Sequence, residues 1–245
     1  MERFFIELFY KGTDYAGFQA QKNANTIQAE VEKALQIYFR KIFLLTGSSR
    51  TDAGVHALQN YFHFDASNMP EGEMLEQSVY HINAILPSTI VLKRIYRVSN
   101  ELHCRFNAIS RTYQYNIYLI KNPFLSETAY FYPHILELDL LQQAATLICD
   151  YSDFESFSKR NTQVHNFECT INKSEWVFEK HILKFTVNGN RFLRGMVRGL
   201  VGTMIKVGRK KISVHDFKEI LENKKKIQAD FSVPAKGLCL IEVNF

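Results

Sequence analysis

The sequence predicts an α+β fold in which two α/β halves share one mainly antiparallel sheet. Two observations support this class. In residues 1–105, apolar patterns of period two and period 3.6 follow one another in the order β-α-β-β-α-β. Residues 106–245 repeat a similar succession, and no long linker or low-complexity segment separates the halves. A length of 245 residues suits one large domain or two small ones.

The first half contains four strand patterns and two helix patterns. We expect strands at 3–10, 42–45, 58–65 and 90–98, and helices at 27–38 and 75–86. Asn25 and Thr26 can cap the first helix, Pro87 ends the second, and the small polar residues 46–49 form a loop. This order resembles a ferredoxin-like or RNA-recognition-like unit, with both helices on one face of an antiparallel sheet.

The second half predicts three strand regions and three helices. Its elements are a strand at 112–120, a helix capped by Asp139 and ending near 148, a hairpin of 174–178 with 183–187, a helix at 190–207, a helix after a Ser213–Asp216 capping box, and a last strand at 238–245. Tyr113 and Tyr115 fall on the same face of the first strand. The alternation of side chains along the strand fits a core position for either tyrosine and does not distinguish the two.

Composition excludes several classes of protein. Hydrophobic residues make up 46% of the chain, too many for a disordered segment, and no apolar run has the length of a membrane span. The N-terminus lacks a signal-peptide pattern, and the four cysteines are scattered without a CxxC pair. We therefore expect a cytoplasmic protein with reduced thiols. The net charge of +5 indicates a nucleic-acid partner only weakly.

The polar stretch 47–57, GSSRTDAGVHA, is the most informative segment. It lies between two predicted strands and places the guanidinium of Arg50 near the carboxylate of Asp52. An Asp beside an Arg stays ionised and can act as a nucleophile or base. An Asx-turn or cap with a surface ion pair is the alternative for an isolated Arg-x-Asp.

The full stretch resembles the catalytic motif of the tRNA pseudouridine synthase A family. Further matches, in order along the chain, are DYAGFQ at 14–19, NAILP at 83–87, Arg105-Phe106, RTYQY at 111–115, DFESF at 153–157, FLRGMVR at 192–198 and GLCL at 237–240. Four positions depart from the family pattern: Phe18 replaces Trp, Ser49 replaces Gly, Asn60 replaces Gln and His165 replaces Arg.

The resemblance implies isomerisation of uridine to pseudouridine in the anticodon stem-loop of tRNA, without metal or organic cofactor. It implies that Asp52 attacks the target nucleoside, at C6 of the base or at C1′ of the sugar. The target base must leave the stack to expose its reacting atoms. The resemblance further implies a pseudouridine synthase fold with the active-site cleft between the halves, and a homodimer.

The resemblance also assigns roles to other residues. Tyr113 packs on the target uridine, Arg50 orients Asp52 and helps hold the flipped nucleotide, and Arg105 contributes to substrate binding. Phe18 and Gln19 belong to the RNA-binding set.

A basic helix predicted at 190–207 is an independent sign of an RNA surface. At 100° per residue, Arg191, Arg194 and Arg198 share one face, and neighbouring glycines leave space for a phosphate backbone. Further lysines and arginines continue to Lys226, although Lys224–Lys226 fits a solvated helix end. Alternatively, this face is simply solvated and the glycines pack against a neighbouring element.

Other candidates are weaker. His63 and Asp65 on one strand are too few ligands for a metal site, so no metal is expected. For His56 we expect a backbone hydrogen bond. An RNA-binding module of the same fold without catalysis is the alternative to an enzyme, since aromatic-bearing sheets also bind RNA.

Overall fold

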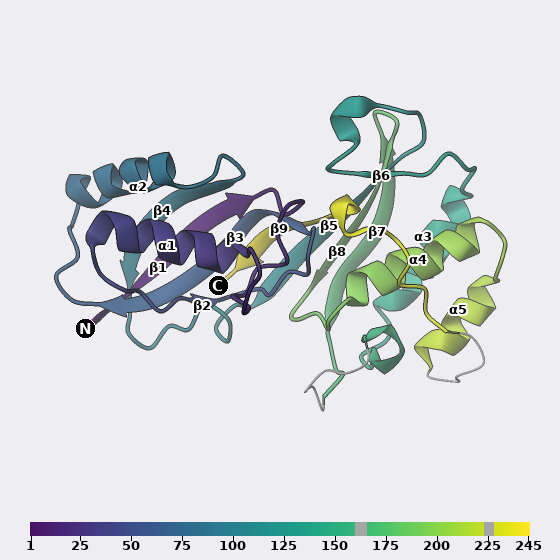
Figure 1. Cartoon of the computed structure of the whole chain (residues 1–245). Coiled ribbons are helices and arrows are strands. Elements are labelled where there is room, and N and C mark those ends of the chain that lie inside the picture. The colour runs from purple at the N-terminus through teal and green to yellow at the C-terminus, as the bar shows by residue number, and fades with distance from the viewer. Residues whose placement is uncertain (160–165, 223–227) are drawn as a thin grey trace. The chain divides into compact units, whose positions relative to one another are not determined.

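The computed structural model describes residues 1–159, 166–222 and 228–245, which form two compact units. Unit 1 contains Met1–Ile109 and Leu240–Phe245, and unit 2 contains Ser110–Cys239 (Figure 1). The C-terminal residues were expected with the second half, but they pair with unit 1. The N–H of Ile109 donates to Asn244, and the ring of Phe245 packs on Phe5 and Tyr61 at centroid distances of 5.4 and 5.0 Å.

Unit 1 has the predicted β-α-β-β-α-β order, with one short additional strand. Its elements are β1 (Glu2–Tyr10), α1 (Ile27–Phe39), β2 (Thr46–Gly47), β3 (His56–Ala66), α2 (Glu73–Ile85), β4 (Ile90–Val98) and most of β9 (Leu238–Asn244). The strand order is β4-β1-β3 with antiparallel pairing, and β2 pairs with β3. Thr26 caps α1 as predicted, because its side chain accepts a hydrogen bond from the N–H of Ala29.

Unit 2 also has mainly antiparallel pairing. It contains β5 (Ser110–Tyr118), β6 (Tyr130–Phe131), α3 (Leu138–Ile148), β7 (Ile171–Glu179), β8 (Ile182–Gly189), α4 (Met196–Gly208) and α5 (Val214–Leu221), with short 3₁₀ turns at Pro123–Leu125, Glu155–Phe157 and Ala235–Gly237. The order is β5-β8-β7, and only β6 runs parallel to its neighbour β5. Both Trp176 and Phe185 are buried against each other beneath α4. The mixed α/β class with mainly antiparallel strands is therefore confirmed.

Several element boundaries differ from those predicted. Residues 42–45 form no strand, although Phe43 and Leu45 are buried and Ile42 and Leu44 are exposed, and pairing with β3 begins instead at Thr46. Asp139 does not cap α3, whose N-cap is Glu137. The capping box of Ser213 and Asp216 at the start of α5 is confirmed.

The helix predicted at 190–207 begins later, at Met196. Gly195 has a φ of 73°, a left-handed conformation that an α-helix does not contain. Arg191 and Arg194 therefore precede α4, and the prediction that they share a helix face with Arg198 was wrong. The angular projection failed because it assumes a helical backbone at every position.

The glycines of α4 face protein. A Cβ at Gly202 would overlap the carbonyl oxygen of Asp230, and one at Gly199 would lie 2.8 Å from the ring of Phe231. The hydroxyl of Thr203 also accepts from the N–H of Asp230 at 2.9 Å. Close approach of the extended segment 230–231 therefore explains these glycines, and the space predicted there for a phosphate backbone does not exist.

None of the helices within the described ranges combines the length and the hydropathy needed to cross a bilayer.

Candidate catalytic loop and RNA-binding residues

The loop from Ser48 to Val55 is held to the sheet at its start by one side chain of β3. Oδ1 of Asn60 accepts from the N–H of Ser49 at 3.2 Å, and its Nδ2 donates to the carbonyl of Ser49 at 2.9 Å. Both residues are buried. A side-chain amide that pairs with both backbone groups of one residue continues the β-ladder beyond the last strand pair.

Tyr10 and Phe18 hold the middle of the loop. The hydroxyls of Tyr10 and Thr51 lie 2.7 Å apart, and Nδ2 of Asn60 donates to the same Tyr10 oxygen at 3.1 Å. The N–H of Phe18 donates to the carbonyl of Thr51 at 3.1 Å. Thr51 is therefore tied to β1 through its side chain and to the 11–26 segment through its backbone.

The far side of the loop is closed by backbone contacts around Asp52. The N–H of Val55 donates to the carbonyl of Asp52 at 3.2 Å, and the N–H of Gly54 donates to Tyr15 at 3.3 Å. The N–H of Gly12 donates to Nδ1 of His56 at 3.0 Å, which confirms the expected backbone hydrogen bond of His56. Contacts on both sides of Asp52 thus restrain the position of its backbone.

Asp52 itself is half-buried and Arg50 is exposed. That Arg50 orients Asp52 stays a prediction. Ser49 and Thr51 are both held inward by Asn60 and Tyr10, and this leaves Arg50 on the solvent side of the loop.

Arg50 lines a pocket of about 260 Å³ beside the loop, entirely within unit 1. The lining residues are Phe18, Gln19, Gln28, Leu45, Thr46, Gly47, Arg50, His103, Arg105 and Phe106. The pocket therefore brings together four of the predicted site residues, Phe18, Gln19, Arg50 and Arg105. Its lining contains two guanidinium groups but no carboxylate. His103 and Phe106 were not predicted for this site; the neighbouring Arg105-Phe106 match was the only signal for Phe106.

Phe18 is part of the core. It is 1% exposed and stacks on Phe62 at 4.4 Å and 11°, and on Tyr10 at 5.7 Å. Its place in the RNA-binding set stays a prediction. Its contribution to the site is indirect, since its backbone holds Thr51.

In unit 2, Tyr113 and Tyr115 differ in burial, although strand alternation did not distinguish them. Tyr115 is 0% exposed, and its hydroxyl donates to the carbonyl of Pro234 at 2.7 Å. Tyr113 is only half-buried and makes an edge contact with Phe192 at a centroid distance of 5.1 Å. Tyr113 is therefore the one with ring surface available to a ligand.

The three arginines predicted for RNA binding have different surroundings. Arg194 is exposed and Arg191 is half-buried. Arg198 donates from Nε and Nη2 to the carbonyl of Val233, at 2.9 and 2.7 Å, and from Nη2 to Phe231 at 3.4 Å. Arg198 therefore holds the 231–233 segment on α4, which corrects its assignment to an RNA-binding helix face.

Among the described residues, one group has the spacing of metal ligands. Ligand atoms of His63, His103 and Cys104 lie within 4.8 Å of one another. The Cys104 thiol already donates to the carbonyl of Thr46 at 3.1 Å, and Nδ1 of His103 accepts from the N–H of Arg105 at 3.1 Å. Asp65, considered with His63 in the sequence, pairs with Arg3 at 2.8 Å. These groups are satisfied by protein partners, and we assign no metal to them.

Comparison with known proteins identifies the family. A family model described as tRNA pseudouridine synthase matches residues 151–245. A tRNA pseudouridine synthase A from Azobacteroides pseudotrichonymphae is 40% identical over 245 residues, which cover all of this chain and 97% of the relative. This chain belongs to the tRNA pseudouridine synthase A family. Members from Parabacteroides distasonis and Staphylococcus aureus are 39% and 35% identical, over 100% and 98% of this chain and 96% and 90% of theirs.

Two of the departures from the tRNA pseudouridine synthase A pattern contact each other. Ser49 and Asn60, which replace Gly and Gln, form the paired hydrogen bonds at the start of the loop. Ser49 is absent from the positive-φ positions, so its backbone does not require glycine. His165 and Lys224–Lys226 lie outside the described residues.

Proposed function

We propose that this protein isomerises uridine to pseudouridine in the anticodon stem-loop of tRNA, with Asp52 as the nucleophile. The observation that carries the proposal is the restrained loop around Asp52. Its backbone is tied to Tyr15, Phe18 and Asn60 and its Thr51 side chain to Tyr10, while the Asp52 side chain stays partly open to solvent. A fixed backbone beneath a reactive carboxylate reduces the reorganisation needed to reach the transition state.

The proposed reaction is an isomerisation, and its atoms and electrons balance without an added reactant. The Asp52 carboxylate attacks C6 of the base or C1′ of the ribose, and the bond between N1 and C1′ breaks. The base turns within the site, and a bond forms between C5 and C1′. C5 then loses its proton, N1 gains one, and the carboxylate is released. No step changes the net oxidation state, so the chemistry requires no redox cofactor.

The proposal also assigns roles in substrate recognition to other residues. The target uridine leaves its stack, because a stacked base hides C6 and C1′. The half-buried ring of Tyr113 supplies a surface for the flipped base, as aromatic side chains commonly do for unstacked nucleotides. Arg50 and Arg105 supply positive charge for phosphate beside the Asp52 loop, with Gln19 at the same pocket. Arg191 and Arg194 add backbone contacts.

The experiment uses purified full-length protein and unmodified tRNA transcripts, with pseudouridine mapped by chemical derivatisation. Wild type is expected to convert uridines of the anticodon stem-loop. Asp52→Ala and the isosteric Asp52→Asn are expected to lose at least about 10³-fold in rate, as nucleophile substitutions do, while tRNA affinity changes less than about twofold. A wild-type protein that binds tRNA but modifies no uridine would support the RNA-binding module instead.

The homodimer and the cytoplasmic location are further parts of the proposal, and both come from the family resemblance. Sedimentation of the purified protein tests the first. A monomer at micromolar concentration with full activity would contradict it.

A further inference from the structure

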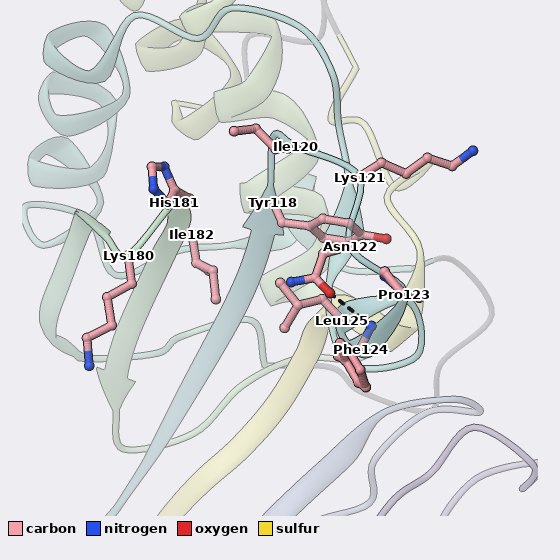
Figure 2. Close-up of a pocket in the computed structure, with 10 residues that line it drawn as sticks. All are labelled: Tyr118, Ile120, Lys121, Asn122, Pro123, Phe124, Leu125, Lys180, His181 and Ile182. Atoms are coloured by element: carbon pink, nitrogen blue, oxygen red, sulfur yellow. Dashed lines mark hydrogen bonds between the residues drawn. The ribbon is translucent and has the colours of Figure 1, made fainter.

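A pocket of about 380 Å³ lies at the hairpin end of β7 and β8 in unit 2, and none of its lining residues belongs to the candidate site. Figure 2 shows its ten lining side chains, which are Tyr118, Ile120, Lys121, Asn122, Pro123, Phe124, Leu125, Lys180, His181 and Ile182. They come from two segments: the turn after β5 and the tip of the β7–β8 hairpin.

One aromatic side chain at this pocket, that of Phe124, is unusually exposed. Phe124 is 91% exposed and Ile120 is 66% exposed, on a protein whose other phenylalanines are mostly buried. The turn that carries Phe124 is ordered, because Oδ1 of Asn122 accepts from the N–H of Phe124 at 3.0 Å, drawn as the dashed line in Figure 2. Pro123 starts the 3₁₀ turn and restricts it further. An aromatic ring fixed in solvent is suited to stacking with a ligand.

The charge at this pocket has one sign. Lys121, Lys180 and His181 line it and no carboxylate does. Neither lysine forms an ion pair with a described carboxylate. The nearest acid in sequence, Glu179, is engaged by Lys184 at 2.7 Å. In Figure 2 the two lysines extend to opposite sides of the pocket, as expected if they reach successive phosphates of one strand.

The hairpin turn requires a backbone conformation that is unfavourable for its two central residues. Lys180 and His181 have φ values of 50° and 64°, and positive φ at both central residues is the pattern of a turn that favours Asn-Gly. Each non-glycine residue there costs on the order of 1 kcal/mol. Two basic residues at a position that favours other types point to a role for their side chains.

We infer that this pocket is a second RNA-binding site, in which an unstacked base of the tRNA stacks on Phe124 while Lys121 and Lys180 contact phosphates on either side. The inference rests on the proposed tRNA substrate. A polyanion fits better than a second copy of this chain, because a two-fold interface through this surface would bring like charges together. Aromatic rings with flanking cations are the usual means of binding single-stranded nucleic acid.

The first test measures tRNA binding by full-length protein, as fluorescence anisotropy over a range of salt concentrations. Lys121→Ala/Lys180→Ala is expected to raise Kd about tenfold and to reduce the slope of log K against log salt by about two. The matched control, Lys173→Ala/Lys218→Ala, removes the same charge from unit 2 at lysines already paired with Glu175 and Glu222. It is expected to change Kd less than twofold. Equal effects of the two double variants would overturn the inference.

The second test reports stacking without relying on charge or activity. Phe124→Trp is expected to retain tRNA affinity and to lose fluorescence on saturation with tRNA, because a base stacks on the new ring. The only native tryptophan, Trp176, is buried and serves as an internal reference. Unchanged tryptophan emission of Phe124→Trp at saturation would overturn the inference. A Phe124→Ala variant whose sedimentation changes while its tRNA affinity does not would also overturn it. Both tests measure tRNA binding. They can therefore be interpreted even if the protein lacks the proposed catalytic activity.

Discussion

The side-chain amide of Asn60 binds both backbone polar groups of Ser49, at 3.2 and 2.9 Å, and so sets the start of the loop that carries Asp52. Neither residue touches the proposed reacting atoms directly. Asn60 is a positioning residue, acting through the backbone three residues before the carboxylate. Substitution of Asn60 is therefore expected to change the rate of the chemical step.

Asn60→Ala is expected to lower kcat about 10- to 100-fold with little change in KM, because a displaced carboxylate loses near-attack geometry while RNA contacts persist. Single-turnover kinetics on tRNA measure this split. A purely structural role would instead lower the amount of folded protein and leave the kcat of the folded fraction unchanged.

The family pattern has Gly and Gln where this chain has Ser49 and Asn60, so the two positions should be energetically coupled. Asn60→Gln alone is expected to destabilise, since the added methylene must fit beside the buried Ser49 side chain. Ser49→Gly/Asn60→Gln is expected to recover most of the loss, with a coupling energy of about 0.5–2 kcal/mol in a double-mutant cycle. Additive effects, measured by urea unfolding, would show that the two side chains do not share this space.

Tyr10→Phe removes the hydroxyl that bridges Thr51 and Asn60. We expect a loss of about 1–2 kcal/mol in the free energy of unfolding, because two buried polar groups lose a partner. Tyr15→Phe is a matched control, since it also removes a hydroxyl that bonds to a threonine, Thr89, while the Tyr15 carbonyl that accepts from Gly54 of the loop is unchanged. A larger fall in kcat for Tyr10→Phe than for Tyr15→Phe would distinguish loop positioning from general stability.

Arg194 and Arg198 lie four residues apart but should respond differently to substitution. Arg194→Ala is expected to weaken tRNA binding and to reduce the salt slope by about one, as for a lost phosphate contact. Arg198→Ala is expected to cost about 1–3 kcal/mol of folding stability, because the carbonyl of Val233 loses its donors. Thermal unfolding and anisotropy on both variants provide the comparison. A reversed pattern would contradict the assignment of Arg198 to the fold.

Folding stability is expected to decrease as the pH falls from 6.5 towards 4. Burial, with the nearby charges of His103 and Arg3, lowers the pKa of His63 from 6.5 to about 4. Between these values the unfolded chain binds the proton and the folded chain does not, so stability is complete above pH 6.5 and declines below it. Urea unfolding at pH 5 to 7 measures the slope, above the ordinary pKa values of Asp65 and Glu7. His63→Gln should reduce the dependence of the free energy of unfolding on pH. An unchanged dependence would show that a group other than His63 is responsible.

Local patterns predicted much of the fold. Alternation and helical period located most strands and helices, and Thr26 and the Ser213–Asp216 box marked two helix starts correctly. These features succeed because they depend on neighbouring residues only. The pattern failed at Gly195, where one left-handed residue ended the assumed helix geometry, and at 42–45, where pairing with β3 begins only at Thr46.

By itself, the sequence determined the mixed α/β class, the family, and Asp52 on a polar loop between strands. Tertiary structure alone decided that Tyr115 rather than Tyr113 is buried, that Arg198 binds the 231–233 carbonyls, and that Asn60 pairs with Ser49. Periodicity tells which face of an element a residue occupies, but not what covers that face. The covering groups are distant in sequence, and their positions follow from packing the whole unit.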